Sequence, residues 1–222
     1  PTGHASMTKT ETAPVIDGMA EDAWNAAMAY DLDTDLGTIA WPTQLLDDPS
    51  DLSVSWKALY DSAGLYVLVD VEDDSFFANN PEDPWADDSV EVYVDGDNNK
   101  GGAYDGLNDH QIWVRTAGND GTDPVIEMGA TNAPEGVETA VAADAGMAHV
   151  EFFFPWSFLR PELGMPGAGE AIGLDVHAID IDEDSNEGLR EHKIAWKSIS
   201  SSGLVDNAWQ DTTLFGTLSV PV

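Results

Sequence analysis

Apolar and polar residues alternate in short segments along the chain, a pattern typical of half-buried β-strands. The clearest segment runs from Val90 to Val94, where three valines alternate with Glu91 and Tyr93. We expect the valines to face a core and Glu91 and Tyr93 to lie on the opposite face of the same sheet. Prolines at positions 81 and 84 exclude a regular helix just before this strand.

Similar short patterns recur from end to end. Ser53–Glu72 predicts a hairpin that turns at Asp61–Gly64. Further strands are expected at 13–18, 110–115, 125–128, 137–142, 147–154, 171–182, 189–197 and 214–220, and short helices at 19–30 and 155–159. Many short strands separated by Gly and Pro predict an all-β fold: a β-sandwich of two mainly antiparallel sheets with one or two short helices. Trp24 is expected to be a buried core residue of the first helix.

The strand at 110–115 extends the face that bears Glu91. If it pairs with the Val90–Val94 strand, Gln111, Trp113 and Arg115 lie beside Glu91 and Tyr93 on one outward surface.

Length and composition indicate one domain. The chain has 222 residues, a length typical of one domain, and no apolar run long enough to span a membrane. It has no cysteine, which excludes disulfides and thiolate metal sites. Residues 1–12 are predicted to be a disordered or vector-derived tail, and residues 13–222 the folded domain.

The charge is strongly acidic. With 42 acidic and 8 basic residues the net charge is −34, which disfavours binding to nucleic acid or to a membrane surface. Two compatible explanations are a surface adapted to a saline environment and carboxylate sites for hard cations.

Two segments have the spacing that opens a calcium-binding loop. One is D-x-D-x-N at Asp95, Asp97 and Asn99, and the other is D-x-D-x-D at Asp180, Asp182 and Asp184. Neither has a Glu at the twelfth position. The alternative is that these acids only form turns in an acidic protein.

Trp85 stands shortly before Glu91 in the sequence. An indole beside a carboxylate on the outer face of a sheet suits a sugar ring, which has an apolar C–H face and a rim of hydroxyls. In the alternative interpretation Trp85 closes the end of the sandwich and Glu91 is a solvated acid.

Five segments, in order, resemble the family 9 carbohydrate-binding modules, which share a DOMON-like sandwich. They are P-V-I-D-G-M-A-E-D-A-W, K-A-L-Y-D-S-A-G-L-Y-V-L-V-D-V-E-D, P-W-A-D-D-S-V-E-V-Y-V-D, V-E-F-F-F-P-W and N-A-W-Q-D-T-T-L-F-G-T-L. Together they cover about Pro14 to Val220.

The resemblance implies a noncatalytic module that sandwiches a sugar, in some members a chain end, between two tryptophans, here Trp85 and Trp209. It also implies polar sugar contacts and structural calcium. The expected sugar-binding residues are Trp85, Trp209, Glu91, Tyr93, Gln111, Trp113, Arg190, Asp206 and Asn207, and Asp73, Asp74 and Asp88 join the calcium candidates. Trp113 stands where the family often has an Arg, which replaces a hydroxyl-binding donor with a third stacking surface.

The resemblance also implies a partner and a location. We expect a polysaccharide or oligosaccharide ligand and a monomeric module of a larger, secreted polysaccharide-degrading protein, with the periplasm and the cell surface as alternative locations. A second hypothesis is a haem b-binding electron-transfer domain of related shape, with Met128, Met147 or Met165 as axial ligands. A third is a hydrolase or lyase that uses some of the abundant carboxylates.

Overall fold

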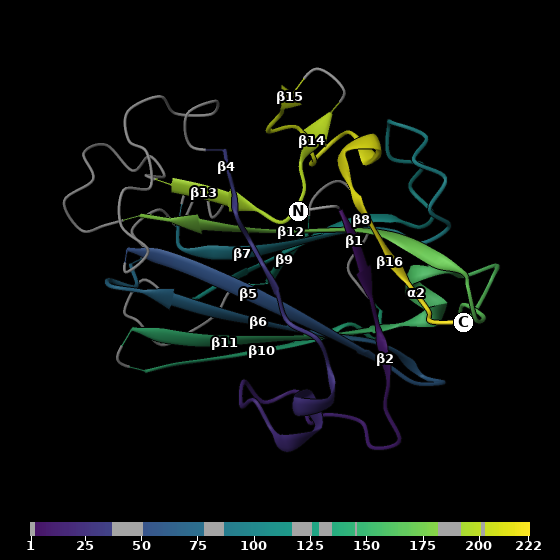
Figure 1. Ribbon diagram of the computed structural model, residues 1–222, viewed down its shortest axis with the longest axis horizontal. Helices are drawn as coiled ribbons and strands as arrows, with labels where there is room; N and C mark the ends of the chain where they lie inside the picture. The colour runs from purple at the N-terminus through teal and green to yellow at the C-terminus, as the bar shows by residue number, and fades with distance from the viewer. Residues whose placement is uncertain are drawn as a thin grey trace.

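Two β-sheets lie face to face in the computed structural model (Figure 1). The structure describes residues 3–36, 51–77, 87–116, 126–128, 135–144, 146–181, 192–200 and 203–222. None of the helices in these ranges is long and apolar enough to cross a membrane.

The first sheet contains the strand predicted at Val90–Val94. Its order is β1 (His4–Ser6), β16 (Gly216–Ser219), β12 (Ala171–Asp180), β7 (Ser89–Asp95), β8 (Asp109–Arg115) and β9 (Ile126–Met128), with β13 (His192–Ala195) pairing with both β12 and β4 (Thr34–Asp35).

The second sheet contains the predicted hairpin. Its order is β10 (Glu138–Asp144), β11 (Met147–Pro155), β6 (Gly64–Asp73), β5 (Leu52–Tyr60) and β2 (Thr8–Lys9), and β3 (Tyr30–Asp31) pairs with β5. A small ribbon of β14 (Ile199–Ser200) and β15 (Gly203–Leu204) lies apart, and the helical turns are η1 (Asp22–Ala26), α2 (Trp156–Leu159) and η3 (Thr212–Leu214).

The predicted all-β sandwich is confirmed. The pairing within the described strands is antiparallel except for β1 with β16 and β2 with β5. The hairpin turns at Asp61, whose carboxylate accepts hydrogen bonds from the backbone N–H groups of Ala63 and Gly64. This carboxylate supplies the acceptors that a tight turn between two strands needs.

Alternation defines the core between the sheets. The valines at 90, 92 and 94 are fully buried there, facing Val67 and Val69 of β6 and Phe152 of β11 in one apolar cluster. Trp56 and Trp196 of this cluster meet edge to face, with ring centroids 5.0 Å apart.

Two local predictions near the N-terminus are wrong. Residues 13–18 form no strand, and the helix expected at 19–30 is only the 3-10 turn Asp22–Ala26. Of its expected apolar face Trp24 is buried, whereas Met28 is 65% exposed. Without a continuous apolar stripe there is little tertiary packing to extend the helix.

Trp24 is buried as predicted, but on the outer face of the second sheet. It packs on Leu59, Tyr66 and Leu68, and its indole N–H donates to Glu151 at 2.9 Å. Glu151 also accepts the backbone N–H groups of Asp17 and Gly18. One fully buried carboxylate therefore fixes the segment that the sequence pattern suggested to be a strand.

Part of the segment predicted to be a tail, residues 1–12, is built into the fold. Residues 4–6 pair with β16 in the first sheet and residues 8–9 pair with β5 in the second. Met7, at the crossing between them, is 0% exposed. The segment is too short to show a clear alternation, but its small and apolar side chains complete both sheets.

Met7→Ala should lower the free energy of unfolding by about 2–5 kcal/mol, the range for truncating a buried side chain to Ala. Urea denaturation measures this change. Lys9→Ala is the control, because that side chain is 63% exposed and surface changes stay within about 0.5 kcal/mol. Equal, small effects of both substitutions would mean that this segment contributes nothing to the fold.

Candidate functional site

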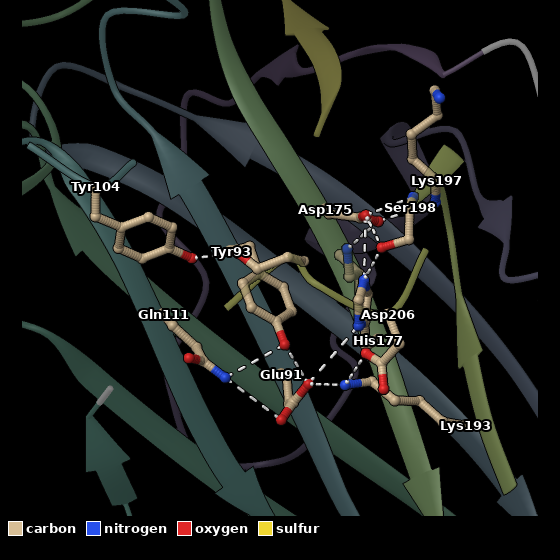
Figure 2. A network of polar contacts seen from close by, with 12 residues as sticks. Glu91, Tyr93, Tyr104, Gln111, Asp175, His177, Lys193, Lys197, Ser198 and Asp206 are labelled. Atoms are coloured by element: carbon tan, nitrogen blue, oxygen red, sulfur yellow. Dashed lines mark hydrogen bonds and ion pairs between the residues drawn. The ribbon is translucent and has the colours of Figure 1, made fainter. Parts of the chain in front are cut away.

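Glu91 lies at the centre of a polar network on the outer face of the first sheet (Figure 2). On one side β8 places Trp113 opposite Glu91 and Gln111 opposite Tyr93. On the other side β12 places His177 opposite Glu91. The predicted pairing of the strand at 110–115 with the valine strand is therefore confirmed.

Both carboxylate oxygens of Glu91 face polar groups. Oε2 accepts from the hydroxyl of Tyr93 at 2.5 Å and lies 2.9 Å from Nζ of Lys193 and 3.7 Å from Nδ1 of His177. Oε1 accepts from the Gln111 amide at 3.5 Å. Charged partners of this kind are what a buried carboxylate needs to remain ionised.

The protonation states of this pair follow from its surroundings. Burial on its own raises the pKa of Glu91, but Lys193, His177 and the Tyr93 hydroxyl together bring that pKa below its ordinary value. Burial and the neighbouring Glu91 charge raise the pKa of Tyr93 well above its usual range. At neutral pH Glu91 is therefore an anion and Tyr93 a neutral hydrogen-bond donor.

Lys193 joins the sheet to the loop that follows it. Its ammonium lies 2.9 Å from Glu91 and 3.1 Å from Oδ1 of Asp206, and its side chain is only 3% exposed. The sequence analysis did not select Lys193 or His177. The parity of their strands could have found both, because Ile194 and Val176 face the core and so turn Lys193 and His177 to the outer face.

This outer face is covered, unlike the open surface that the sequence suggested. Glu91, Tyr93 and Gln111 are each less than 5% exposed. Tyr93 packs against Ala208 and Phe215, which belong to the segment after β15, and the Tyr104 hydroxyl donates to the Ala208 carbonyl at 2.7 Å. Tyr93 therefore positions Glu91 from within and does not line an open surface.

Trp209 projects from this cover. It is 52% exposed and sits in a turn closed by a bond from Gln210 N–H to the Asn207 carbonyl. It follows Asp206, the partner of Lys193, by three positions. Trp209 is therefore not a core residue. The predicted contacts Trp85 and Arg190 lie outside the described residues.

Three calcium candidates come together at one end of the sandwich. Ligand oxygens of Asp73, Asp88 and Asp180 all lie within 4.8 Å of one another, and all three residues are buried. Burial, followed by the charges of Asp73 and Asp180, raises the pKa of Asp88 well above its usual range. Asp51 and His192 form a second group with the same Asp180.

The remaining calcium candidates do not join these groups. Asp74 is exposed, and Asp182 and Asp184 lie outside the described residues. In the D-x-D-x-N segment the oxygens bond locally: Asp97 accepts from the backbone and side-chain N–H groups of Asn99, and Asp95 accepts from Lys100 N–H. This loop is a turn held by its own acids, and its calcium site stays a prediction.

Comparison with known proteins assigns the family. The profile of the family described as carbohydrate family 9 binding domain-like matches residues 16–221. The chain belongs to this family of carbohydrate-binding domains. The resemblance that five sequence segments carried is thereby confirmed.

The curated relatives are large enzymes. The chain is 30% identical over 205 residues to endo-1,4-beta-xylanase A of Thermoanaerobacterium saccharolyticum and 31% identical over 205 residues to exoglucanase XynX of Acetivibrio thermocellus, covering 92% of this chain in each case. It spans only 15% and 16% of the length of those two proteins. The similarity is thus to a noncatalytic part of each enzyme.

Solved structures share the fold. A family 9 carbohydrate-binding module from Caldicellulosiruptor kristjanssonii in complex with cellotriose superposes with a TM-score of 0.77 at 20% identity, covering 98% of this chain and 93% of that one. The same kind of module from that organism in complex with glucose gives a TM-score of 0.74, also at 20% identity, over 98% and 94% of the two chains.

The three methionines named as candidate haem ligands lie on different parts of the fold. Met147 begins β11 in the second sheet and Met165 follows α2 with 47% of its surface exposed, whereas Met128 lies on β9 of the first sheet.

The free energy of unfolding should rise by about 1–3 kcal/mol between pH 7 and pH 5. Burial raises the pKa of both Asp95 and Asp109 to about 6. The folded chain then holds protons that the unfolded chain has released, so ionisation above pH 6 destabilises the fold. Urea denaturation in EDTA at the two pH values measures the difference.

Asp95→Asn should flatten this pH dependence, and Glu162→Gln, at an exposed position, should leave it unchanged. A pH dependence identical in Asp95→Asn and the parent chain would contradict the role of Asp95.

Proposed function

We propose that the chain is a noncatalytic module that holds a sugar ring against the exposed indole of Trp209, with Trp85 on the other side of the ring. The observation that carries the proposal is the position of Trp209. A half-exposed indole follows, by three residues, an acid that is ion-paired with the buried Lys193–Glu91 network.

The indole supplies affinity. Stacking it on the C–H face of a pyranose removes apolar surface from water at about 25 cal/mol per Å². Covering both faces of the ring supplies several kcal/mol before the entropy of association is subtracted, and the net affinity expected is millimolar to micromolar, roughly 4–8 kcal/mol.

The polar network supplies orientation. The half-buried Asp206 and Asn207 offer acceptors and donors to hydroxyls, and the buried Lys193 and Gln111 hold these polar groups in place from beneath. Arg190 is a further donor in this proposal, and Trp113 a further apolar surface. A sugar that lacks a matching hydroxyl leaves a desolvated charge without a partner, which is how such a site discriminates.

The ligand class we propose is a glucan or xylan chain, bound at a chain end. The relatives that carry such a domain include a xylanase and an exoglucanase, and the related modules were solved with cellotriose and glucose. In this proposal the module brings an attached enzyme to polysaccharide outside the cell. The net charge of −34 supports a saline environment and disfavours nucleic acid and membranes as partners.

We also propose a structural calcium ion at Asp73, Asp88 and Asp180. Three buried carboxylates within 4.8 Å of one another repel one another, and a divalent cation with oxygen ligands removes that repulsion. Asp88 also accepts the N–H of Ile181 at 2.7 Å. Because Asp73 ends β6 and Asp180 ends β12, the ion would join the ends of these two strands across the two sheets.

Trp209→Ala should weaken binding of cellotriose or xylotriose by about tenfold to a hundredfold, since it removes one stacking surface worth roughly 1.5–3 kcal/mol. Isothermal titration calorimetry measures the affinity and a melting curve measures stability. Because Trp209 is exposed, the melting temperature should change little.

Leu163→Ala, at a side chain that is 56% exposed, is the control and should leave binding intact. The proposal fails if Trp209→Ala binds as well as the parent chain, or if the parent chain binds no glucan or xylan fragment.

EDTA should lower the melting temperature by roughly 5–10 °C, as expected for loss of a ligand held at about a hundred times its Kd in a domain of this size. Excess calcium should restore the melting temperature. Asp180→Asn should melt at the lower temperature with or without EDTA. Identical melting curves of the parent chain in calcium and in EDTA would rule out the site.

A further inference from the structure

Asp175 is a further buried carboxylate in the polar network around Glu91 (Figure 2). It lies on β12 opposite Tyr93 and is 0% exposed. Its Oδ1 accepts the N–H groups of Val176 and Lys197, each at 2.9 Å. Its Oδ2 accepts the backbone N–H of Ser198 at 2.8 Å and the Ser198 hydroxyl at 3.0 Å.

Asp175 therefore fixes the point at which the chain leaves β13. Ser198 has a φ of +37°, in the left-handed region that a residue with a side chain adopts at an energetic penalty. Two bonds from Ser198 to one carboxylate offset that penalty. The Ser198 carbonyl in turn accepts from Val205 N–H, so Ser198 anchors the segment that carries Asp206, Asn207 and Trp209.

Asp175 also reaches Glu91 through His177. Nε2 of His177 lies 3.1 Å from Oδ2 of Asp175 and 2.7 Å from the Ser198 hydroxyl. Nδ1 of the same ring lies 3.7 Å from Oε2 of Glu91. The ring also packs against Tyr93, with centroids 4.6 Å apart, so its orientation is fixed by both carboxylates and by the aromatic neighbour.

We propose that Asp175 is a positioning residue for sugar binding, acting on Trp209 through Ser198 and on Glu91 through His177. The inference rests on the proposed function, since it assumes that the sugar binds at Trp209 and at the polar groups that the Glu91 network holds in place. Asp175 does not touch the ligand, because it has no exposed surface. Its role is to set the distance between the stacking indole and the polar groups that orient the ring.

Asp175→Asn tests this role with little change in shape. The amide has one acceptor oxygen where the carboxylate has two, and its NH₂ faces groups that donate. Affinity for cellotriose, measured by calorimetry well below the melting temperature, should fall about tenfold or more, because the charge-assisted hydrogen bonds that position the Trp209 segment and His177 are weakened.

Glu151→Gln is the matched control. Glu151 is equally buried and accepts three N–H groups, but it lies on the outer face of the other sheet. It should lose comparable stability and keep its affinity for cellotriose within about twofold. Equal losses of affinity in both variants would reduce the effect of Asp175 to general destabilisation and overturn the proposal.

A second measurement follows Trp209 directly. Its indole N–H signal in a proton–nitrogen spectrum, assigned with Trp209→Phe, should shift in Asp175→Asn and stay in place in Glu151→Gln. This arm needs no ligand. If the parent chain binds no sugar, the proposed function fails while the position of Trp209 still decides the role of Asp175.

Ser198→Gly completes the test. Glycine removes the left-handed penalty and the hydroxyl together, so Asp175→Asn should weaken binding less in the Ser198→Gly background than in the parent chain. Additive effects would overturn the link through Ser198. If Asp175→Asn does not fold, Ser198→Ala takes its place, and an unchanged affinity and an unchanged Trp209 signal in that variant would overturn the proposal.

Discussion

A charge can be buried in a protein only where other groups replace its water, and this constraint organises the sheet faces of the domain. Glu91, Glu151 and Asp175 are each almost or fully buried. Each receives several donors from segments distant in sequence: Glu91 from β13 and β8, Glu151 from residues 17–24, Asp175 from residues 197–198. The irregular segments are thus tied to the sheets by carboxylates, while the valine-rich faces hold the sheets to each other.

Because basic residues are scarce, each buried cation has a specific role in neutralising buried acids. The chain has only 8 Lys and Arg against 42 acids, yet Lys193 and Arg115 are almost completely buried. Lys193 meets Glu91 and Asp206, and Arg115 meets the buried Asp87 at 2.9 Å. Losing either cation would leave uncompensated anions in a protein that already repels itself, so neither is interchangeable with a surface lysine.

The sequence predicted the parts of the fold that depend on alternation. The valine strand, its pairing with the strand bearing Gln111 and the hairpin at Asp61 all follow from period-two patterns and turn residues. The N-terminal strands escaped prediction, because two or three residues carry no readable period and gain their structure only from neighbours far along the chain. Lys193 and His177 were not predicted for a different reason. The resemblance implied Arg190 as the basic contact, whereas the alternation of inward and outward side chains along β13 and β12 determines which residues reach Glu91.

The crossing of the N-terminal segment between the sheets has a mechanical consequence. His4–Ser6 runs parallel to Gly216–Ser219, so tension applied between the start of the first segment and the end of the second acts along both strands. Their hydrogen bonds then resist sliding together, whereas a hairpin pulled at its open end loses its bonds one after another. The first and last described strands of the domain are thus a pair that is oriented to resist being pulled apart.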